Sequence, residues 1–279
     1  MKDDYSRSIS SRYLIGKPDA HKTWQYMHAI GGKASQLTRI SPKLVPTWVA
    51  ITSDCPDRRL PDVCDKAWKI ILTQALEDEA HPMGEPPIEH TLFAVRSSAM
   101  EEDGDNQSFA GIFESKLNVY VSSIEHAVRE VRDSALAERV LTYQEARDLS
   151  TLSVPAVIIM PMVDAKYSGV LFTKEPVDGT DRMLLEYEQG IGGVVDGTGD
   201  SMTFFLDRNN FYETSMLKAT LPPYDEELTH SHPPAAIHTI WEEAKRLENN
   251  YRKPLDIEWA VDQDDKPWIL QVRPITAGV

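Results

Sequence analysis

The sequence predicts an α+β protein, because helical and strand patterns occupy different parts of the chain. In the first 150 residues, apolar side chains recur at helical intervals in several stretches. From residue 154 onward the chain consists mainly of short apolar runs separated by Gly, Asp and Pro, which is typical of strands. The 279 residues can bury a hydrophobic core, and this length suits either one large two-lobed domain or two smaller domains.

The first half is predicted to hold most of the helices. The elements predicted there are helices at about 21–29, from 33 onward, at 62–79 and at about 122–147, and strands at 46–52 and 91–97. Gly31 and Gly32 interrupt the first helical stretch, and a polar, acidic loop at 98–108 follows the second strand. Ser122 and Glu125 have the spacing of a capping box, which predicts that a helix begins near Ser122.

The second half is predicted to be rich in strands, with one helix near its end. The predicted strands cover 156–163, 169–173, 183–187, 202–206, 255–261 and 269–273, and the helix covers about 236–251. The last two strands are separated by residues 262–266, which predict a hairpin turn.

The acidic composition argues against two classes of function. The 44 Asp and Glu residues against 29 Lys and Arg residues give a formal net charge of −15, which opposes unassisted binding to nucleic acid or to an anionic membrane. The sequence shows no secretory signal and no run of about 18 apolar residues, so we expect a cytoplasmic location. Cys55 and Cys64 are too few for a zinc site, and we interpret them as reduced thiols.

The two final strands carry the first candidate site. Period-2 alternation places Asp256 and Glu258 on one face of the first strand, and it groups Gln271 with Arg273 on the second. A two-residue loop at 264–265 would set Glu258 opposite Gln271 and Asp256 opposite Arg273. Two carboxylates, an amide and a guanidinium would then share one face of the hairpin.

Such a set of polar side chains suits a magnesium and phosphate site. Mg²⁺ takes one or two oxygen ligands from protein and completes its shell with water and substrate phosphates. A neighbouring Arg binds phosphate oxygens through its planar fork. The alternative interpretation of an Asp-x-Glu strand is a solvated outer face of an edge hairpin. Pairing with Gln271 and Arg273 favours the functional interpretation.

Five groups of short segments form a pattern from about residue 30 to residue 276. The first group is DIEW at 256–259 with LQVRPIT at 270–276, and the second is GGKASQL at 31–37 with the strand at 45–52. The third group is VRSS at 95–98 with SFAG at 108–111 and LNV at 117–119. The fourth is MV at 162–163 with SGVLFT at 168–173 and PVDG at 176–179, and the fifth is GIG at 190–192 with VV at 194–195 and Gly197. This pattern resembles the nucleotide-binding domain of pyruvate phosphate dikinase, phosphoenolpyruvate synthase and rifampin phosphotransferase. The resemblance implies an ATP-grasp fold with mixed and antiparallel sheets, flanking helices and the nucleotide in a cleft between two lobes. It implies one domain over 1–279, with an N-terminal lobe at about 1–163 and a C-terminal lobe at about 164–279.

The resemblance also implies how the N-terminal lobe would bind phosphate. Lys33 would neutralise the α and β phosphates of ATP, and Arg96 would face the terminal phosphates. Gly111 and Ser115 would belong to a loop that folds over the phosphates, where a glycine lets backbone N–H groups approach the anion. Taken without the resemblance, Gly111 would equally suit a plain turn.

In the C-terminal lobe the resemblance implies a metal and phosphoryl site. Glu258 and Gln271 would hold Mg²⁺ with Asp256 assisting, and Arg273 would bind the phosphoryl group that moves. Phosphoryl transfer needs in-line positioning and fixed positive charge and little covalent work from protein, so no side-chain nucleophile is required.

The resemblance places adenine against the backbone of Met160, Met162 and Val163, and it includes Glu186 in the nucleotide-binding set. Methionines at such positions are also common as core filling.

Two positions depart from the pattern: Met160 stands where related proteins commonly have Gln, and Gly193 stands where many have Glu. These departures affect the expected adenine and ribose or phosphate contacts and leave the phosphate-binding set in place.

The expected phosphoryl acceptor is not part of the pattern. None of the eight histidines lies in a Thr-Ser-His acceptor motif, and we interpret the histidines at 230 and 232 as part of a solvated loop or cap. The chain ends shortly after the RPIT segment. We therefore expect either a phosphohistidine on a separate partner protein or domain, or a small-molecule acceptor.

The leading hypothesis is an Mg-ATP-dependent phosphotransferase of the dikinase type, with neither nucleic acid nor membrane as a partner. The first alternative is an ATP or AMP sensor without chemistry, which would have little use for two phosphate-facing arginines and a metal pair. The second alternative is an ATP-grasp ligase that forms an acyl phosphate, which the dikinase-type segments disfavour.

Overall fold

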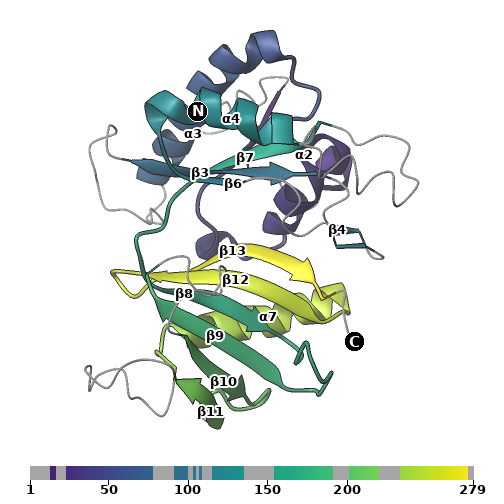
Figure 1. Ribbon diagram of the computed structural model, residues 1–279, viewed down its shortest axis with the longest axis vertical. Coiled ribbons are helices and arrows are strands. Elements are labelled where there is room, and N and C mark those ends of the chain that lie inside the picture. The colour runs from purple at the N-terminus through teal and green to yellow at the C-terminus, as the bar shows by residue number, and fades with distance from the viewer. Residues whose placement is uncertain are drawn as a thin grey trace, which may run out of the picture. The chain divides into compact units, whose positions relative to one another are not determined.

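Two sheets of antiparallel strands, one in each of two units, organise the part of the chain that the structure describes (Figure 1). The computed structural model describes residues 13–16, 23–77, 91–99, 103–104, 107–108, 115–134, 154–190, 201–219 and 233–275. The first unit consists of Met1–Arg39 and Pro46–Met162, and the second consists of Ile40–Val45 and Val163–Val279. The short segment Ile40–Val45 thus belongs with the C-terminal half of the chain, which the sequence did not predict.

The first unit contains a five-stranded antiparallel sheet with the strand order β1-β2-β7-β3-β6. Its strands are β1 (Leu14–Gly16), β2 (Val49–Ile51), β7 (Ala156–Pro161), β3 (Leu92–Ser98) and β6 (Ser115–Tyr120). The sequence predicted β2, β3 and β7. It did not predict β6, a short edge strand in which Val119 alone is buried. A short hairpin of β4 (Asp103–Gly104) and β5 (Gln107–Ser108) lies in the stretch predicted as a polar loop.

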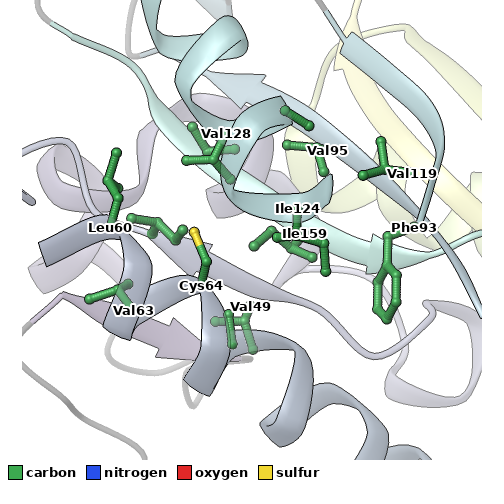
Figure 2. Packing of buried hydrophobic residues seen from close by; sticks show 14 of the residues in the cluster. Val49, Leu60, Val63, Cys64, Phe93, Val95, Val119, Ile124, Val128 and Ile159 are labelled. Atoms are coloured by element: carbon green, nitrogen blue, oxygen red, sulfur yellow. The ribbon is translucent and has the colours of Figure 1, made fainter. Parts of the chain in front are cut away.

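Helices α3 (Leu60–Glu77) and α4 (Ile124–Asp133) pack on one face of this sheet (Figure 2). Because side chains alternate along a strand, Phe93 and Val95 of β3 and Ile159 of β7 reach that face. They meet apolar side chains at helical spacing, among them Val63, Ala67 and Ile71 of α3 and Ile124, Val128 and Val131 of α4. This hydrophobic core fixes β3, and alternation places Arg96 of β3 on the opposite face.

Helix α2 (Thr23–Leu37) is interrupted at Gly31, which confirms the prediction from the two glycines. Gly31 has φ 74° and ψ −179°, so the helix consists of two pieces joined at a kink. Positive φ is costly for a residue with a Cβ atom and is readily adopted by glycine. The second helical piece therefore starts immediately before Lys33.

The predicted capping box at the start of α4 is wrong. A 3-10 turn, η5 (Val121–Ser123), precedes the helix, and the N-cap residue Ser123 makes no side-chain capping hydrogen bond. The Glu125 carboxylate accepts hydrogen bonds from Nε and Nη2 of Arg129 at 3.0 and 2.8 Å. An ion pair with a residue one turn along the helix thus occupies the carboxylate that a capping box would use. The predicted continuation of this helix to about residue 147 lies outside the described residues.

The second unit contains a six-stranded antiparallel sheet with the strand order β11-β10-β9-β8-β12-β13. Its elements are β8 (Ala165–Phe172), β9 (Met183–Gln189), β10 (Met202–Leu206), β11 (Thr214–Ala219), α7 (Ile237–Tyr251), β12 (Leu255–Asp262) and β13 (Pro267–Pro274). Helix α7 covers one face and contacts β12 and β13 (Figure 1). All of these elements except β11 were predicted, and the α+β class is confirmed.

The centre of the six-stranded sheet depends on a glycine. The Tyr187 ring lies 6.1 Å from the Trp259 ring and 6.0 Å from the Phe204 ring. In the strand register, Gly169 lies between Tyr187 and Trp259, and a Cβ atom at Gly169 would lie 2.0 Å from the backbone oxygen of Glu186. The absence of a side chain at Gly169 therefore permits Tyr187 to pack near Trp259 of β12.

Both cysteines are free and buried, in agreement with their interpretation as reduced thiols. Burial raises the pKa of the Cys55 thiol and raises that of Cys64 to about 12. Among the helices in the described ranges, none is long and apolar enough to cross a membrane.

Glu243 on α7 holds the segment Ile40–Val45 within the second unit. Its carboxylate accepts hydrogen bonds from Ser41 N at 2.7 Å and Ser41 Oγ at 2.9 Å, and two from Arg246 at 2.8 and 2.6 Å. Burial raises the pKa of Glu243, but the hydrogen bonds from Arg246 and Ser41 outweigh burial and leave the pKa below its ordinary value of 4.5. The ionised form of Glu243 therefore stabilises the folded unit.

We predict that Glu243→Gln lowers the free energy of unfolding at pH 7 by about 1–3 kcal/mol, because it weakens a buried acceptor of four hydrogen bonds. A folded pKa below the unfolded value means that the stabilisation is present above pH 4.5 and is lost as the pH falls through the folded pKa. Urea unfolding at pH 7 and at pH values below 4.5 should thus show a difference that shrinks on acidification. Glu242→Gln, at an exposed position on the same helix, is the control. Equal stability of Glu243→Gln and wild type at pH 7 would contradict this role.

Candidate active site

The β12–β13 hairpin brings together the four polar residues predicted to pair. Asp256 lies opposite Arg273, and Glu258 lies opposite Gln271, in the antiparallel register of the two strands. Paired residues of neighbouring strands have their side chains on the same face of the sheet. That face is opposite the one where Trp259 is buried, so the hairpin separates an apolar side from a polar side.

The turn differs from the predicted two-residue loop, although the register agrees with the prediction. Asp262 N donates to Lys266 O at 3.0 Å, so residues 263–265 form a three-residue turn. Asp265 adopts the left-handed region with φ 59°. A β-bulge after Glu258 then shifts the register by one residue and restores the pairing that a two-residue loop would give.

An ion pair orients Arg273. Its Nε and Nη2 atoms lie 2.7 and 2.6 Å from the same carboxylate oxygen of Asp256, Oδ2. The Asp256 side chain is 9% exposed and the Arg273 side chain 32% exposed, so the guanidinium reaches solvent from a buried anchor. Burial raises the pKa of Asp256, the Arg273 charge opposes that shift, and Glu258 adds to it. The pKa of Asp256 remains above its ordinary value.

The second oxygen of Asp256 is buried and differs from the first in its contacts. Among the described residues, Asp256 Oδ1 is a buried atom with no hydrogen-bond partner. A buried carboxylate oxygen without a partner carries a desolvation cost, which a cation or a bound water would relieve. This observation fits an oxygen-binding cation at the hairpin.

Glu258 and Glu186 share one face but lie apart. Glu258 neighbours Val170 of β8, and Val170 neighbours Glu186 of β9, so two strand spacings, about 10 Å, separate the two glutamates. In the described part of the chain no group of three or more His, Cys, Asp or Glu side chains is arranged to hold a metal. The polar face carries the paired side chains of Glu258 and Gln271, and Mg²⁺ uses only a few protein oxygens when phosphates and water complete its shell.

In the first unit, the kink of α2 packs Lys33 against the end of β3. Lys33 Nζ donates to Ser97 Oγ at 3.4 Å, and Ser98 Oγ accepts a hydrogen bond from Ala34 N at 3.0 Å. A Cβ atom at Gly31 would lie 1.8 Å from Ser98 O, so only glycine allows the two segments to approach this closely. The serines of the VRSS segment thus position the lysine, a role that the sequence did not assign to them.

Arg96 and Ser115 are neighbours across β3 and β6. Arg96 also pairs with Ile158 of β7, two residue pairs from the pairing of Ala94 with Met160. Arg96 and Met160 therefore lie on the same face of the five-stranded sheet. Met160 is 2% exposed, which agrees with core filling by its side chain.

The remaining predicted positions are placed as follows. Met162 N donates to Leu92 O at 2.8 Å, so an adenine contact from Met162 would use its carbonyl group or side chain. Val163 is buried and is the first residue of the C-terminal part of the second unit. Gly111 and Gly193 lie outside the described residues.

A comparison with protein families finds a match over residues 61–278 to the model of the pyruvate phosphate dikinase AMP/ATP-binding domain. Similar proteins include the prodigiosin synthesizing transferase PigC of Serratia marcescens, with 34% identity over 66% of this chain and 22% of that protein. A probable phosphoenolpyruvate synthase of Methanothermobacter thermautotrophicus is 32% identical over 66% of this chain and 29% of that protein. A rifampicin phosphotransferase of Streptomyces sviceus is 30% identical over 67% of this chain and 24% of that protein. The matched region therefore spans about a quarter of the length of these relatives.

We predict that Gly31→Ala destabilises the protein more than Gly190→Ala. Both glycines have positive φ, 74° and 78°, a backbone conformation in which an alanine is strained by about 1–3 kcal/mol. Among the described residues, a Cβ atom at Gly190 meets no atom within 4 Å, whereas a Cβ atom at Gly31 would collide with Ser98. Urea unfolding of both variants measures the difference. Equal losses of stability would contradict the close packing of the kink on β3.

Proposed function

Because the chain belongs to the family of the pyruvate phosphate dikinase AMP/ATP-binding domain, we propose that it is an ATP-dependent phosphotransferase of the dikinase type. Family membership agrees with the ATP-grasp assignment made from the sequence and supports ATP as the substrate. Relatives named phosphoenolpyruvate synthase and rifampicin phosphotransferase support transfer of a phosphoryl group. The observation that carries the proposal is the pairing of Asp256 with Arg273 and of Glu258 with Gln271 on one polar face.

Arg273 is assigned to the phosphoryl group that moves. A guanidinium whose Nε and Nη2 atoms are bound to Asp256 has a fixed plane, and a fixed cation stabilises the charge that develops on equatorial oxygens without reorganisation during the reaction. In the transfer step the bond between phosphorus and the leaving phosphate oxygen breaks while a bond to the acceptor nitrogen or oxygen forms. Asp256 would thus act mainly by orienting Arg273, with Oδ1 remaining for the metal.

The hairpin residues fit Mg²⁺. Glu258 and Gln271 would hold the ion, assisted by the buried oxygen Asp256 Oδ1 that has no partner among the described residues. Carboxylate and amide oxygens are hard ligands of the kind that Mg²⁺ prefers. When bound, the ion would neutralise the phosphates of ATP and orient them.

Lys33 and Arg96 are assigned to the same nucleotide. We propose that the two units form one nucleotide-binding domain, with the N-terminal lobe at about 1–163 and the C-terminal lobe at about 164–279. Lys33 would bind the α and β phosphates, and Arg96, with its neighbour Ser115, would bind the terminal phosphates. The backbone near Met162 and Val163 would contact adenine. In an acidic protein, such placed cations supply the local positive charge that ATP requires.

The acceptor would be a histidine on a separate domain or protein, or a small molecule. Transfer by way of a histidine would release AMP and phosphate, whereas direct transfer of one phosphoryl group would release ADP. We propose a cytoplasmic setting, because ATP and Mg²⁺ are available there.

We predict that incubation of the full chain with Mg-ATP and a phosphohistidine-domain acceptor produces AMP and not ADP. Anion-exchange chromatography of the nucleotides measures the product. ADP as the sole product would reject the dikinase type in favour of a simple kinase or a ligase. Binding of ATP without any product in the presence of acceptor would favour the sensor alternative.

We predict that Glu258→Gln and Arg273→Lys each lower kcat by at least about 100-fold, because each removes charge or bidentate geometry needed in the transition state. The controls are Glu242→Gln and Arg182→Lys, which change exposed residues of the same unit. Both controls should retain the wild-type kcat. Thermal unfolding of all four variants reports whether the fold is intact. Wild-type turnover by either Glu258→Gln or Arg273→Lys would reject the assignment of the hairpin as the catalytic site.

A further inference from the structure

A buried polar network connects the end of β8, the last turn of α7 and the start of β12. Thr173, with 0% exposure, donates from Oγ1 to Glu248 Oε1 at 2.6 Å and accepts at the same oxygen from Leu255 N at 2.8 Å. Arg208 Nη1 lies 2.6 Å from Glu248 Oε2, and Arg208 Nη2 donates to Thr173 O. Every member of the network is at least partly buried.

Thr173 holds the first residue of β12 on both of its backbone groups. Thr173 N donates to Leu255 O at 2.8 Å, while Leu255 N donates to the Thr173 hydroxyl. The residue before Leu255 is Pro254, which has no N–H group, and Pro254 O accepts from Ile275 N at 2.9 Å. The carbonyl oxygen of Thr173 accepts from Arg208, so the Thr173 hydroxyl is the acceptor for Leu255 N. This contact lies where the chain leaves α7 and enters the hairpin.

The position of Leu255 determines that of the ion pair. Asp256 follows Leu255 directly, and its carboxylate oxygen Oδ2 is the atom to which both Nε and Nη2 of Arg273 bind. Leu255 itself lies opposite Pro274, next to Arg273, in the strand register. A displacement of Leu255 would thus move Asp256 relative to Arg273 and change the plane of the guanidinium.

We propose that Thr173 is a positioning residue for Arg273, acting through Leu255 and Asp256, and that Glu248 and Arg208 fix the Thr173 hydroxyl for this purpose. The inference rests on the proposed function for its catalytic consequence. A hydroxyl has one proton, and Glu248 as acceptor directs that proton away from Leu255 N, so a lone pair of the oxygen faces the N–H group. Valine has the shape of threonine and can neither accept from Leu255 N nor donate to Glu248.

The test uses the full chain labelled with ¹⁵N and compares wild type with Thr173→Val, Thr173→Ser and Thr52→Val. The first readout is the Nε–H resonance of Arg273, identified by its loss in Arg273→Lys. The second readout is kcat and KM for ATP. Thr52→Val is the matched control, because Thr52 is also buried and its hydroxyl donates to Asp54 Oδ1 at 2.6 Å in the first unit.

We expect Thr173→Val to shift or broaden the Arg273 resonance and to lower kcat by about 10- to 100-fold, with KM for ATP changed by less than about threefold. Thr173→Ser keeps the hydroxyl and should restore both readouts, and Thr52→Val should leave both at wild-type values. A wild-type resonance and kcat in Thr173→Val would overturn the inference, as would a defect that Thr173→Ser does not relieve.

Two further results keep the test decisive. If Thr173→Val does not fold, Glu248→Leu replaces it, since leucine can neither pair with Arg208 nor accept from the Thr173 hydroxyl; an unchanged Arg273 resonance would then overturn the inference. If wild type does not turn over ATP, the proposed function fails, while the resonance of Arg273 still tests whether Thr173 positions the guanidinium.

Discussion

The antiparallel register of β12 and β13 is the constraint on which the rest of the site depends. It sets Glu258 opposite Gln271 and Asp256 opposite Arg273. Side chains with oxygen atoms suited to a metal ion therefore lie beside a guanidinium that an ion pair orients. A slip of one residue would turn each of these side chains to the other face of the sheet. The same slip would bring the indole of Trp259, which is 1% exposed, out of the core. The apolar burial that stabilises the sheet therefore also selects the register that the proposed chemistry needs.

Each unit supports its polar residues with a buried core and with one glycine. In the six-stranded sheet, Gly169 allows Tyr187 to pack near Trp259 behind the hairpin. In the five-stranded sheet, Gly31 allows the second piece of α2 to lie against the end of β3, where Lys33 meets Ser97. Charged groups held on strands and helix starts keep their geometry better than groups on loops, which suits the fixed positive charge required for phosphoryl transfer.

Much of the fold and of the hairpin could be predicted from the sequence, because both follow from local periodicity. Alternation in β12 and β13, together with an assumed two-residue loop, predicted the pairing of Asp256 with Arg273. The pairing is correct although the turn has one residue more than predicted, because a bulge compensates for it. Edge strands such as β6, the return of Ile40–Val45 to the second unit and the contacts of Thr173 could not be predicted. These features depend on contacts between residues far apart in the chain, such as Ser41 with Glu243, and no local pattern encodes such contacts.

The most direct measurement of the central claim is a crystal structure of the full chain with a nonhydrolysable ATP analogue and Mn²⁺ in place of Mg²⁺. We predict an anomalous peak about 2.1 Å from side-chain oxygens of Glu258 and Gln271, with the triphosphate against Lys33, Arg96 and Arg273. A bound nucleotide whose metal peak lies away from both Glu258 and Gln271 would contradict the assignment of the hairpin as the catalytic centre.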